Sequence, residues 1–261
     1  MGVVNATPDS FSDGGRFLDG AAAVSHGLRL LADGADILDI GGESTRPEAE
    51  PVPDAEELAR IVPVIARIKA ERPDAVISVD TMKPAVARAA IEAGAAIWND
   101  VTALSYAPDS LETAAELGCE VVLMHMLGEP RTMQADPRYG DVVAEVRDYL
   151  AARAEAAVRA GVARDRVWLD PGLGFGKTLE HNLALLRALP ELKALGYPLL
   201  VGASRKSMIG RLDPAGAQPE DRLGGSLAAA LWSASQGADV LRVHDVRETV
   251  QALKVWAAMA G

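Results

Sequence analysis

The sequence repeats one unit, which consists of a segment with helical spacing of apolar residues, a glycine, and a short aliphatic run that ends in a polar residue. Four full copies occupy 34–40, 94–100, 118–125 and 237–244. Because glycine suits the left-handed residue that ends a helix, each copy predicts a junction between a helix and the following strand. Four further aliphatic runs bring the expected strands to eight, at 2–5, 75–80, 167–170 and 198–202.

These runs are short and almost wholly apolar, as strands are in a parallel sheet that is covered on both faces. Amphipathic segments lie between them, for example from Leu58 to Ile68, after a pair resembling a capping box at Asp54 and Glu57. Eight strands alternating with eight helices predict an α/β fold, a (β/α)8 TIM barrel that forms a single domain over residues 1–261. A doubly wound sheet is the alternative.

Charge and composition narrow the expected partners. The formal net charge of -11 provides no basic field for nucleic acid or an anionic membrane. No run approaches the roughly 18 apolar residues of a membrane span, and no signal-peptide pattern opens the chain, so a cytoplasmic location is expected. Cys119 is the single cysteine, which excludes an intrachain disulfide and a cysteine-based metal cluster. Because the chain is acidic overall, an anionic ligand must be held by a few local cations or by helix N-termini.

Polar residues follow all eight expected strands, at the end where barrel enzymes place their chemistry. They are Asn5, Asp39, Asp80, Asn99 with Asp100, His125, Asp170, Ser204 to Lys206, and Arg242 with His244. Asp80, Asn99 and Asp170 form an acceptor-rich patch that suits the donor edge of a flat nitrogen heterocycle. A metal site made by the same residues is an alternative.

Two basic groups predict anion binding. Arg242 and His244 project to the same side of the last strand, beside a helix expected from Asp245, and suit phosphate or pyrophosphate. Residues 204–207 place two cations and two hydroxyls at a helix start, which suits a carboxylate or a ring carbonyl.

Three glycine-containing loops are expected to contact a ligand. The run 170–178 lacks the first glycine of a P-loop, where Pro171 stands, so its glycines are expected to let the backbone approach a ligand on which Phe175 stacks. The polar loops 5–15 and 41–47 have the glycine hinges of lids that exclude water.

In these segments the chain resembles the dihydropteroate synthase family of pterin-binding enzymes. The resemblance covers essentially the whole chain in order, at 5–15, 39–47, 78–81, 98–101, 123–126, 170–177, 204–207 and 242–245. It implies a transferase of folate biosynthesis that joins 6-hydroxymethyl-7,8-dihydropterin pyrophosphate to p-aminobenzoate, giving 7,8-dihydropteroate and pyrophosphate. It also implies Mg2+ as cofactor, a homodimer, and an enzyme that is a target of sulfonamides.

The resemblance assigns roles by motif. The pterin is expected to be held by Asp80, Asn99, Asp170 and Lys206, with Met124 and Phe175 beside it. Pyrophosphate is expected to bind Asn5, Arg46, Arg242 and His244, with Asn5 also contacting the metal. The aminobenzoate is expected to lie among Thr45, Arg46, Pro47, Phe175 and Ser207, and Gly202 completes the substrate-binding set.

The family's reaction is dissociative, so the leaving pyrophosphate needs stabilisation more than the amine needs a strong base. The catalytic group is therefore expected to be Arg46, Lys206, Arg242 and His244. The two polar loops are expected to order around pyrophosphate first and then to complete the aminobenzoate pocket, which gives ordered binding.

Other functions stay open at this point. A pterin-binding methyltransferase domain of the same superfamily would share the acids and amides, but it expels no pyrophosphate and has no need of the basic groups at 204–207 and 242–244. An inactive paralogue would keep the same residues without the activity. A barrel aldolase would need a Schiff-base lysine in an apolar strand, and none is evident.

Overall fold

The computed structural model describes residues 1–6, 15–44, 50–129 and 131–260. Its strands are β1 (Gly2–Asn5), β2 (Ile37–Gly41), β3 (Val76–Asp80), β4 (Ile97–Asp100), β5 (Glu120–Met124), β6 (Val167–Asp170), β7 (Leu200–Val201) and β8 (Val240–Leu241). From β1 to β6 each strand pairs in parallel with the next, and β7 pairs in parallel with β8.

Two parallel bridges join these sheets into a ring. Leu169 on β6 is bridged to Leu199 before β7, and Gly2 on β1 is bridged to Val243 after β8. At the second junction the amide of Val3 donates to the carbonyl of Val243 at 3.0 Å, and the amide of Val243 donates to the carbonyl of Met1 at 2.9 Å. The strands therefore close in chain order, which confirms the predicted α/β barrel.

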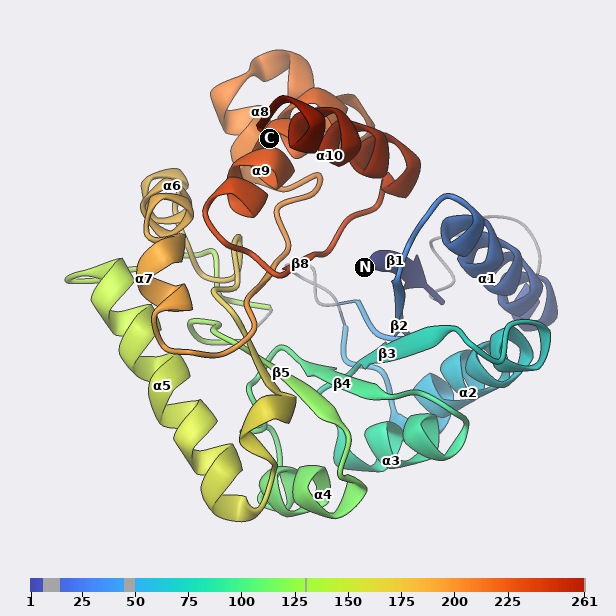
Figure 1. Cartoon of the computed structure of the whole chain (residues 1–261). Helices are drawn as coiled ribbons and strands as arrows, with labels where there is room; N and C mark the ends of the chain where they lie inside the picture. The colour runs from blue at the N-terminus through green and yellow to red at the C-terminus, as the bar shows by residue number, and fades with distance from the viewer. Residues whose placement is uncertain (7–14, 45–49, 130, 261) are drawn as a thin grey trace.

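Helices form an outer layer around the strands (Figure 1). They are α1 (Gly15–Ala32), α2 (Asp54–Glu71), α3 (Pro84–Glu92), α4 (Ser110–Leu117), α5 (Val142–Ala160), α6 (Leu179–Arg187), α7 (Leu189–Lys193), α8 (Ser207–Leu212), α9 (Leu223–Ser235) and α10 (Val246–Ala260). Short 3-10 turns lie at Arg164–Arg166, Pro214–Gly216 and Pro219–Arg222. In the described ranges no helix is long and apolar enough to cross a membrane.

The glycine junctions take the predicted conformation. Positive φ angles of 102°, 112°, 58° and 94° occur at Gly34, Gly94, Gly118 and Gly237. Each hydrogen-bonded strand begins two or three residues after its glycine, because the turn ends at the glycine and one or two more residues precede the strand.

The predicted capping box at Asp54 and Glu57 is wrong. Pro53 occupies the N-cap position of α2 and makes no side-chain cap, while Glu57 is fully buried. Its carboxylate accepts a hydrogen bond of 2.7 Å from Lys83 Nζ, which also lies 2.8 Å from the Glu43 carboxylate. The Glu57 side chain therefore joins α2 to the loop after β3, a contact that local sequence spacing does not reveal.

Candidate functional site

Arg242 follows β8 directly and contacts side chains from β2 and β3. Its Nε donates to Asp39 Oδ2 at 2.6 Å, and its Nη2 donates to Asp80 Oδ2 at 2.8 Å. Asn99 Nδ2 donates to the same Asp39 oxygen at 3.2 Å. Asp39 is fully buried, and its Oδ1 has no hydrogen-bond partner among the residues that the structure describes. Asp80 and Asn99, which were expected in one polar patch, thus lie with Arg242 of the expected anion site around Asp39.

The electrostatics of this cluster depend on burial. Burial raises the pKa of Asp80 to about 7, the Arg242 guanidinium opposes that rise, and the nearby Asp39 carboxylate adds to it. One guanidinium is therefore shared by two carboxylates, and a ligand with N–H donors would relieve the crowding of negative charge.

Asp170 and Lys206 face the same region from β6 and from the start of α8. Asp170 is buried and accepts a hydrogen bond of 2.7 Å from the amide of Gly172. Lys206 Nζ lies 4.2 Å from the centre of the Phe175 ring, within the range of a cation–π contact. Burial first and Arg242 second lower the pKa of Lys206 to about 8. Lys206 is thus a mostly protonated donor at neutral pH, which suits the carboxylate or ring carbonyl expected at residues 204–207.

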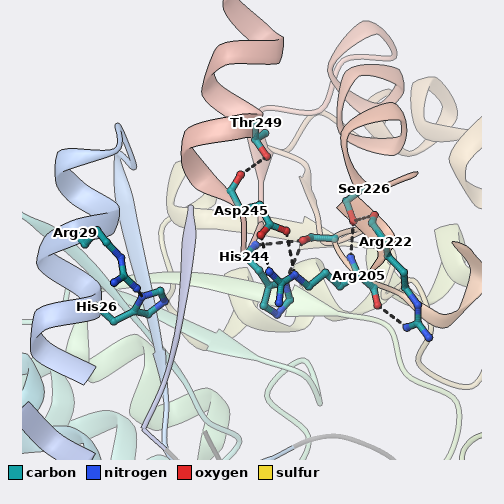
Figure 2. A network of polar contacts seen from close by, with 9 residues as sticks. His26, Arg29, Arg205, Arg222, Ser226, His244, Asp245 and Thr249 are labelled. Atoms are coloured by element: carbon teal, nitrogen blue, oxygen red, sulfur yellow. Dashed lines mark hydrogen bonds and ion pairs between the residues drawn. The ribbon is translucent and has the colours of Figure 1, made fainter. Parts of the chain in front are cut away.

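His244 lies in a positively charged neighbourhood (Figure 2). Its Nδ1 is 3.0 Å from Ser204 Oγ. Burial, followed by the charges of Arg242 and Arg205, lowers the pKa of His244 to about 4. The ring is therefore neutral at pH 7, and it would meet an anion as a neutral N–H donor and not as a cation.

Only one of the two cations predicted at 204–207 faces the strand-end region. Arg205 pairs with Asp245 through Nε at 3.0 Å and Nη2 at 2.5 Å, as Figure 2 shows. Its amide donates to Ser226 Oγ, and its carbonyl accepts from Arg222. Arg205 consequently fixes the turn before α8 against α9 and α10, and Lys206 alone is directed to the substrate region.

The remaining predicted residues fall into two groups. Asn5 ends β1 opposite Gly41, Met124 is buried at the end of β5, Gly202 lies beside the Arg242 side chain, and Ser207 is exposed at the first turn of α8. Thr45, Arg46, Pro47 and most of the loop 5–15 lie outside the described residues.

Asp39 was expected to follow the second strand and was given no role, whereas in the structure it lies within β2. The signal was available, because a carboxylate in the middle of the apolar run Ile37–Gly41 is costly unless a cation meets it. Its partner Arg242 is 203 positions away along the chain, and no spacing rule connects them.

Comparisons with known proteins agree with this geometry. Residues 1–244 match the family model described as pterin binding enzyme. The dihydropteroate synthase of Escherichia coli K12 is 52% identical over 255 residues, which are 98% of this chain and 89% of that relative.

Solved structures give the same result. The Xanthomonas albilineans dihydropteroate synthase with 4-aminobenzoic acid has a TM-score of 0.94 and 53% identity, covering 100% of this chain and 92% of that one. The same enzyme with 7,8-dihydropteroate has a TM-score of 0.91 and 50% identity, covering 100% and 93%. The Yersinia pestis enzyme in complex with a sulfonamide drug has a TM-score of 0.93 and 47% identity, again covering 100% and 93%. Since sequence and fold both agree along nearly the whole chain, it belongs to the dihydropteroate synthase family of pterin-binding enzymes.

Proposed function

We propose that this chain joins 6-hydroxymethyl-7,8-dihydropterin pyrophosphate to p-aminobenzoate and releases 7,8-dihydropteroate and pyrophosphate in folate biosynthesis. The observation that supports this most directly is the cluster in which Arg242 reaches both Asp39 and Asp80 beside Asn99. In this cluster, hydrogen-bond acceptors that suit the N–H groups of a heterocycle lie beside a guanidinium that suits an anionic leaving group. The relatives that bind 4-aminobenzoic acid and 7,8-dihydropteroate share half of this sequence.

The pterin lies on the buried polar floor in this proposal. The carboxylates of Asp80 and Asp170 accept from the ring N–H groups, Asn99 supplies an amide, and Lys206 donates to the ring carbonyl. Met124 and Phe175 pack against the ring. A flat ring that is fixed by its polar edge leaves its methylene group facing the barrel mouth.

Pyrophosphate departure is the step that the proposal asks the protein to assist. Arg242 stabilises the departing charge, and His244 adds a neutral N–H donor, since its pKa is lowered to about 4. Asn5 and Arg46 complete the anion site. The aniline nitrogen attacks the resulting cationic pterin methylene to form the C–N bond, and its extra proton passes to the released pyrophosphate or to water. The nearby carboxylates Asp39 and Asp80 favour the cation electrostatically.

The aminobenzoate pocket is proposed from Phe175, Gly202 and Ser207 together with Thr45, Arg46 and Pro47. Its carboxylate would lie beside Ser207 at the start of α8. Binding is ordered in this proposal, because the residues of the two polar loops complete this pocket only after pyrophosphate is present. A sulfonamide would compete for the same place, as the complex of the Yersinia pestis relative suggests.

Magnesium fits the site only together with the substrate. Within the described ranges, no group of three or more His, Cys, Asp or Glu side chains could hold a metal ion. The Asn5 side-chain oxygen at the end of β1 is a hard ligand of the kind that Mg2+ accepts, and the ion usually completes its shell with phosphate oxygens and water. We propose that Asn5 would hold Mg2+ with pyrophosphate, where the ion would neutralise charge on the leaving group.

The proposed assembly is a cytoplasmic homodimer of single-domain chains, each domain spanning 1–261. Leu227 and Leu231 of α9 and Val255, Trp256 and Met259 of α10 line an apolar groove of about 360 Å³. Val255 and Met259 are 55% and 75% exposed, respectively, which is unusual for apolar side chains unless another surface covers them. A second copy of the chain is the proposed occupant.

The test is to incubate the purified protein with the dihydropterin pyrophosphate, p-aminobenzoate and magnesium while following both products. Equal formation of pyrophosphate and dihydropteroate is expected, with large losses for Lys206→Ala and Arg242→Ala. Binding of the pterin pyrophosphate without product would favour an inactive paralogue. Binding of methyltetrahydrofolate alone would favour a methyltransferase domain.

A further inference from the structure

The loop between β6 and α6 (171–178) packs against the segment that follows β5 so closely that side chains have no room. Gly172 and Gly176 both have φ of 66°. A Cβ on Gly172 would overlap the His125 carbonyl oxygen, and a Cβ on Gly176 would lie 2.7 Å from the Leu127 carbonyl oxygen. The backbone of this loop therefore has one permitted position against the end of β5.

Lys177 lies across this contact and is almost completely buried, at 1% exposure. Its Nζ is 2.9 Å from His125 Nδ1, and it donates to the His125 carbonyl at 3.2 Å and to the Phe175 carbonyl at 3.0 Å. These three partners use all three N–H donors of the ammonium. Among the described residues Lys177 forms no ion pair with a carboxylate. Burial is the main cause that lowers the pKa of Lys177 to about 7, and the Asp170 carboxylate opposes that change. A lysine that is this costly to bury is not accounted for by stability alone.

His125 is suited to accept from this lysine. It is buried at 5% exposure, and its ring centre lies 4.9 Å from that of Tyr149 in an edge-to-face arrangement. Burial, and then the Lys177 charge, lower the pKa of His125 to about 3. The ring is therefore neutral, and Nδ1 can accept a hydrogen bond.

These contacts fix the position of the Phe175 backbone. The ends of the loop have their own hydrogen bonds, from the Gly172 amide to Asp170 and from the Gly174 amide to Asn182 Oδ1, each at 2.7 Å. The Phe175 carbonyl is held by Lys177, while the Phe175 ring contacts Lys206. Lys177 thus connects the end of β5 to the aromatic ring at the substrate region.

We propose that Lys177 is a positioning residue, which fixes the Phe175 backbone against His125 and thereby sets the aromatic surface on which the arylamine substrate packs. The proposal rests on the proposed function, in which Phe175 borders the aminobenzoate pocket. It assigns to a buried lysine, which has no role in the proposed chemistry, control over arylamine recognition.

The test compares Lys177→Met, which keeps the length of the side chain, with Lys193→Met on the surface helix α7. For Lys177→Met we expect the KM for p-aminobenzoate to rise by about tenfold or more, which corresponds to losing a hydrogen bond from a charged donor. The dissociation constant of the pterin pyrophosphate, measured by calorimetry without aminobenzoate, should change by less than about threefold. Phe175 also packs against the pterin in our proposal, but the polar partners Asp80, Asn99, Asp170 and Lys206 fix that ring, so the aminobenzoate should be the more sensitive of the two. Lys193→Met should match the wild type in both measurements.

A pair of His125 variants tests the same contact if Lys177→Met fails to fold. His125→Leu removes the Nδ1 acceptor and should raise the KM for p-aminobenzoate, whereas His125→Asn keeps an acceptor near that position and should restore most of it. Equal KM values for both His125 variants, or a folded Lys177→Met with wild-type KM, would overturn the proposal. Lack of product from the wild type would instead contradict the proposed function, so the two failures are distinguishable.

Discussion

At the scale of a single residue, the charge of Lys206 is set by its surroundings. Burial and Arg242 lower its pKa to about 8, and only the protonated ammonium can donate to a ring carbonyl. We therefore expect kcat/KM for the pterin substrate to fall as pH rises above about 8, because kcat/KM reports ionisations of the free enzyme. In Lys206→Arg the cation stays protonated through this range, so the alkaline fall should disappear even if the rate is lower. A fall at the same pH in Lys206→Arg would assign it to another group.

Arg242 also neutralises buried carboxylates, so it affects stability. Asp39 is fully buried, and the Asp80 side chain is 14% exposed. Replacing Arg242 by Met leaves both without their cation and should destabilise the fold by about 3 kcal/mol at pH 8, within the range for breaking a buried pair. The loss should shrink as pH falls, because the raised folded-state pKa of Asp80 lets the carboxyl protonate and lose its charge. Urea unfolding at pH 8 and pH 5.5 measures the loss of unfolding free energy at each pH. Arg187→Met, at an exposed position of α6, is the control. An equal loss at both pH values would contradict it.

At the scale of elements, the sequence predicted what local rules determine. Glycine at 34, 94, 118 and 237 predicted the helix-to-strand junctions, because a left-handed residue is a local requirement. Glu57 was assigned wrongly, since its partner Lys83 is reached only after the barrel has folded. Arg205 was predicted to face a ligand, but it forms an ion pair with Asp245, directly before α10. Local backbone demands are readable in a sequence, whereas the direction of a charged side chain depends on distant partners.

The loop after β6 gives a prediction at this scale. Gly172→Ala adds a methyl group that overlaps the His125 carbonyl, whereas Gly128→Ala, at a similar φ of 75°, adds one with no atom of the described residues within 4 Å. Both variants share the strain of a left-handed alanine, roughly 1–2 kcal/mol. Only Gly172→Ala must also displace the backbone between β5 and β6, so its Tm should fall further and its affinity for p-aminobenzoate should drop. Equal Tm values for the two variants would show that the loop can shift freely.

At the scale of the whole molecule, closure of the ring determines which residues meet. Asp39 lies on β2 and Arg242 directly follows β8, far apart in the sequence. They are neighbours because the residue after Arg242 is bridged to β1, and β1 pairs with β2. The resemblance assigned Asp80 to the pterin and Arg242 to the pyrophosphate of one substrate. The direct ion pair between Arg242 and Asp80 depends on how β2, β3 and β8 are aligned in the ring, and so does the central position of Asp39. Neither was predictable from sequence spacing.

The groove between α9 and α10 gives the last prediction. If a second chain covers it, the wild type should have twice the 27.4 kDa mass of one chain by light scattering. Val255→Glu places a carboxylate in that groove and should yield monomers, because an unpaired charge in an apolar interface is costly. The same change at the exposed Val158 of α5 should leave the dimer intact. None of the residues that line this groove binds substrate in our proposal, so the monomeric variant should keep its activity per chain. A monomeric wild type, or a Val255→Glu dimer, would place the second copy elsewhere or exclude it.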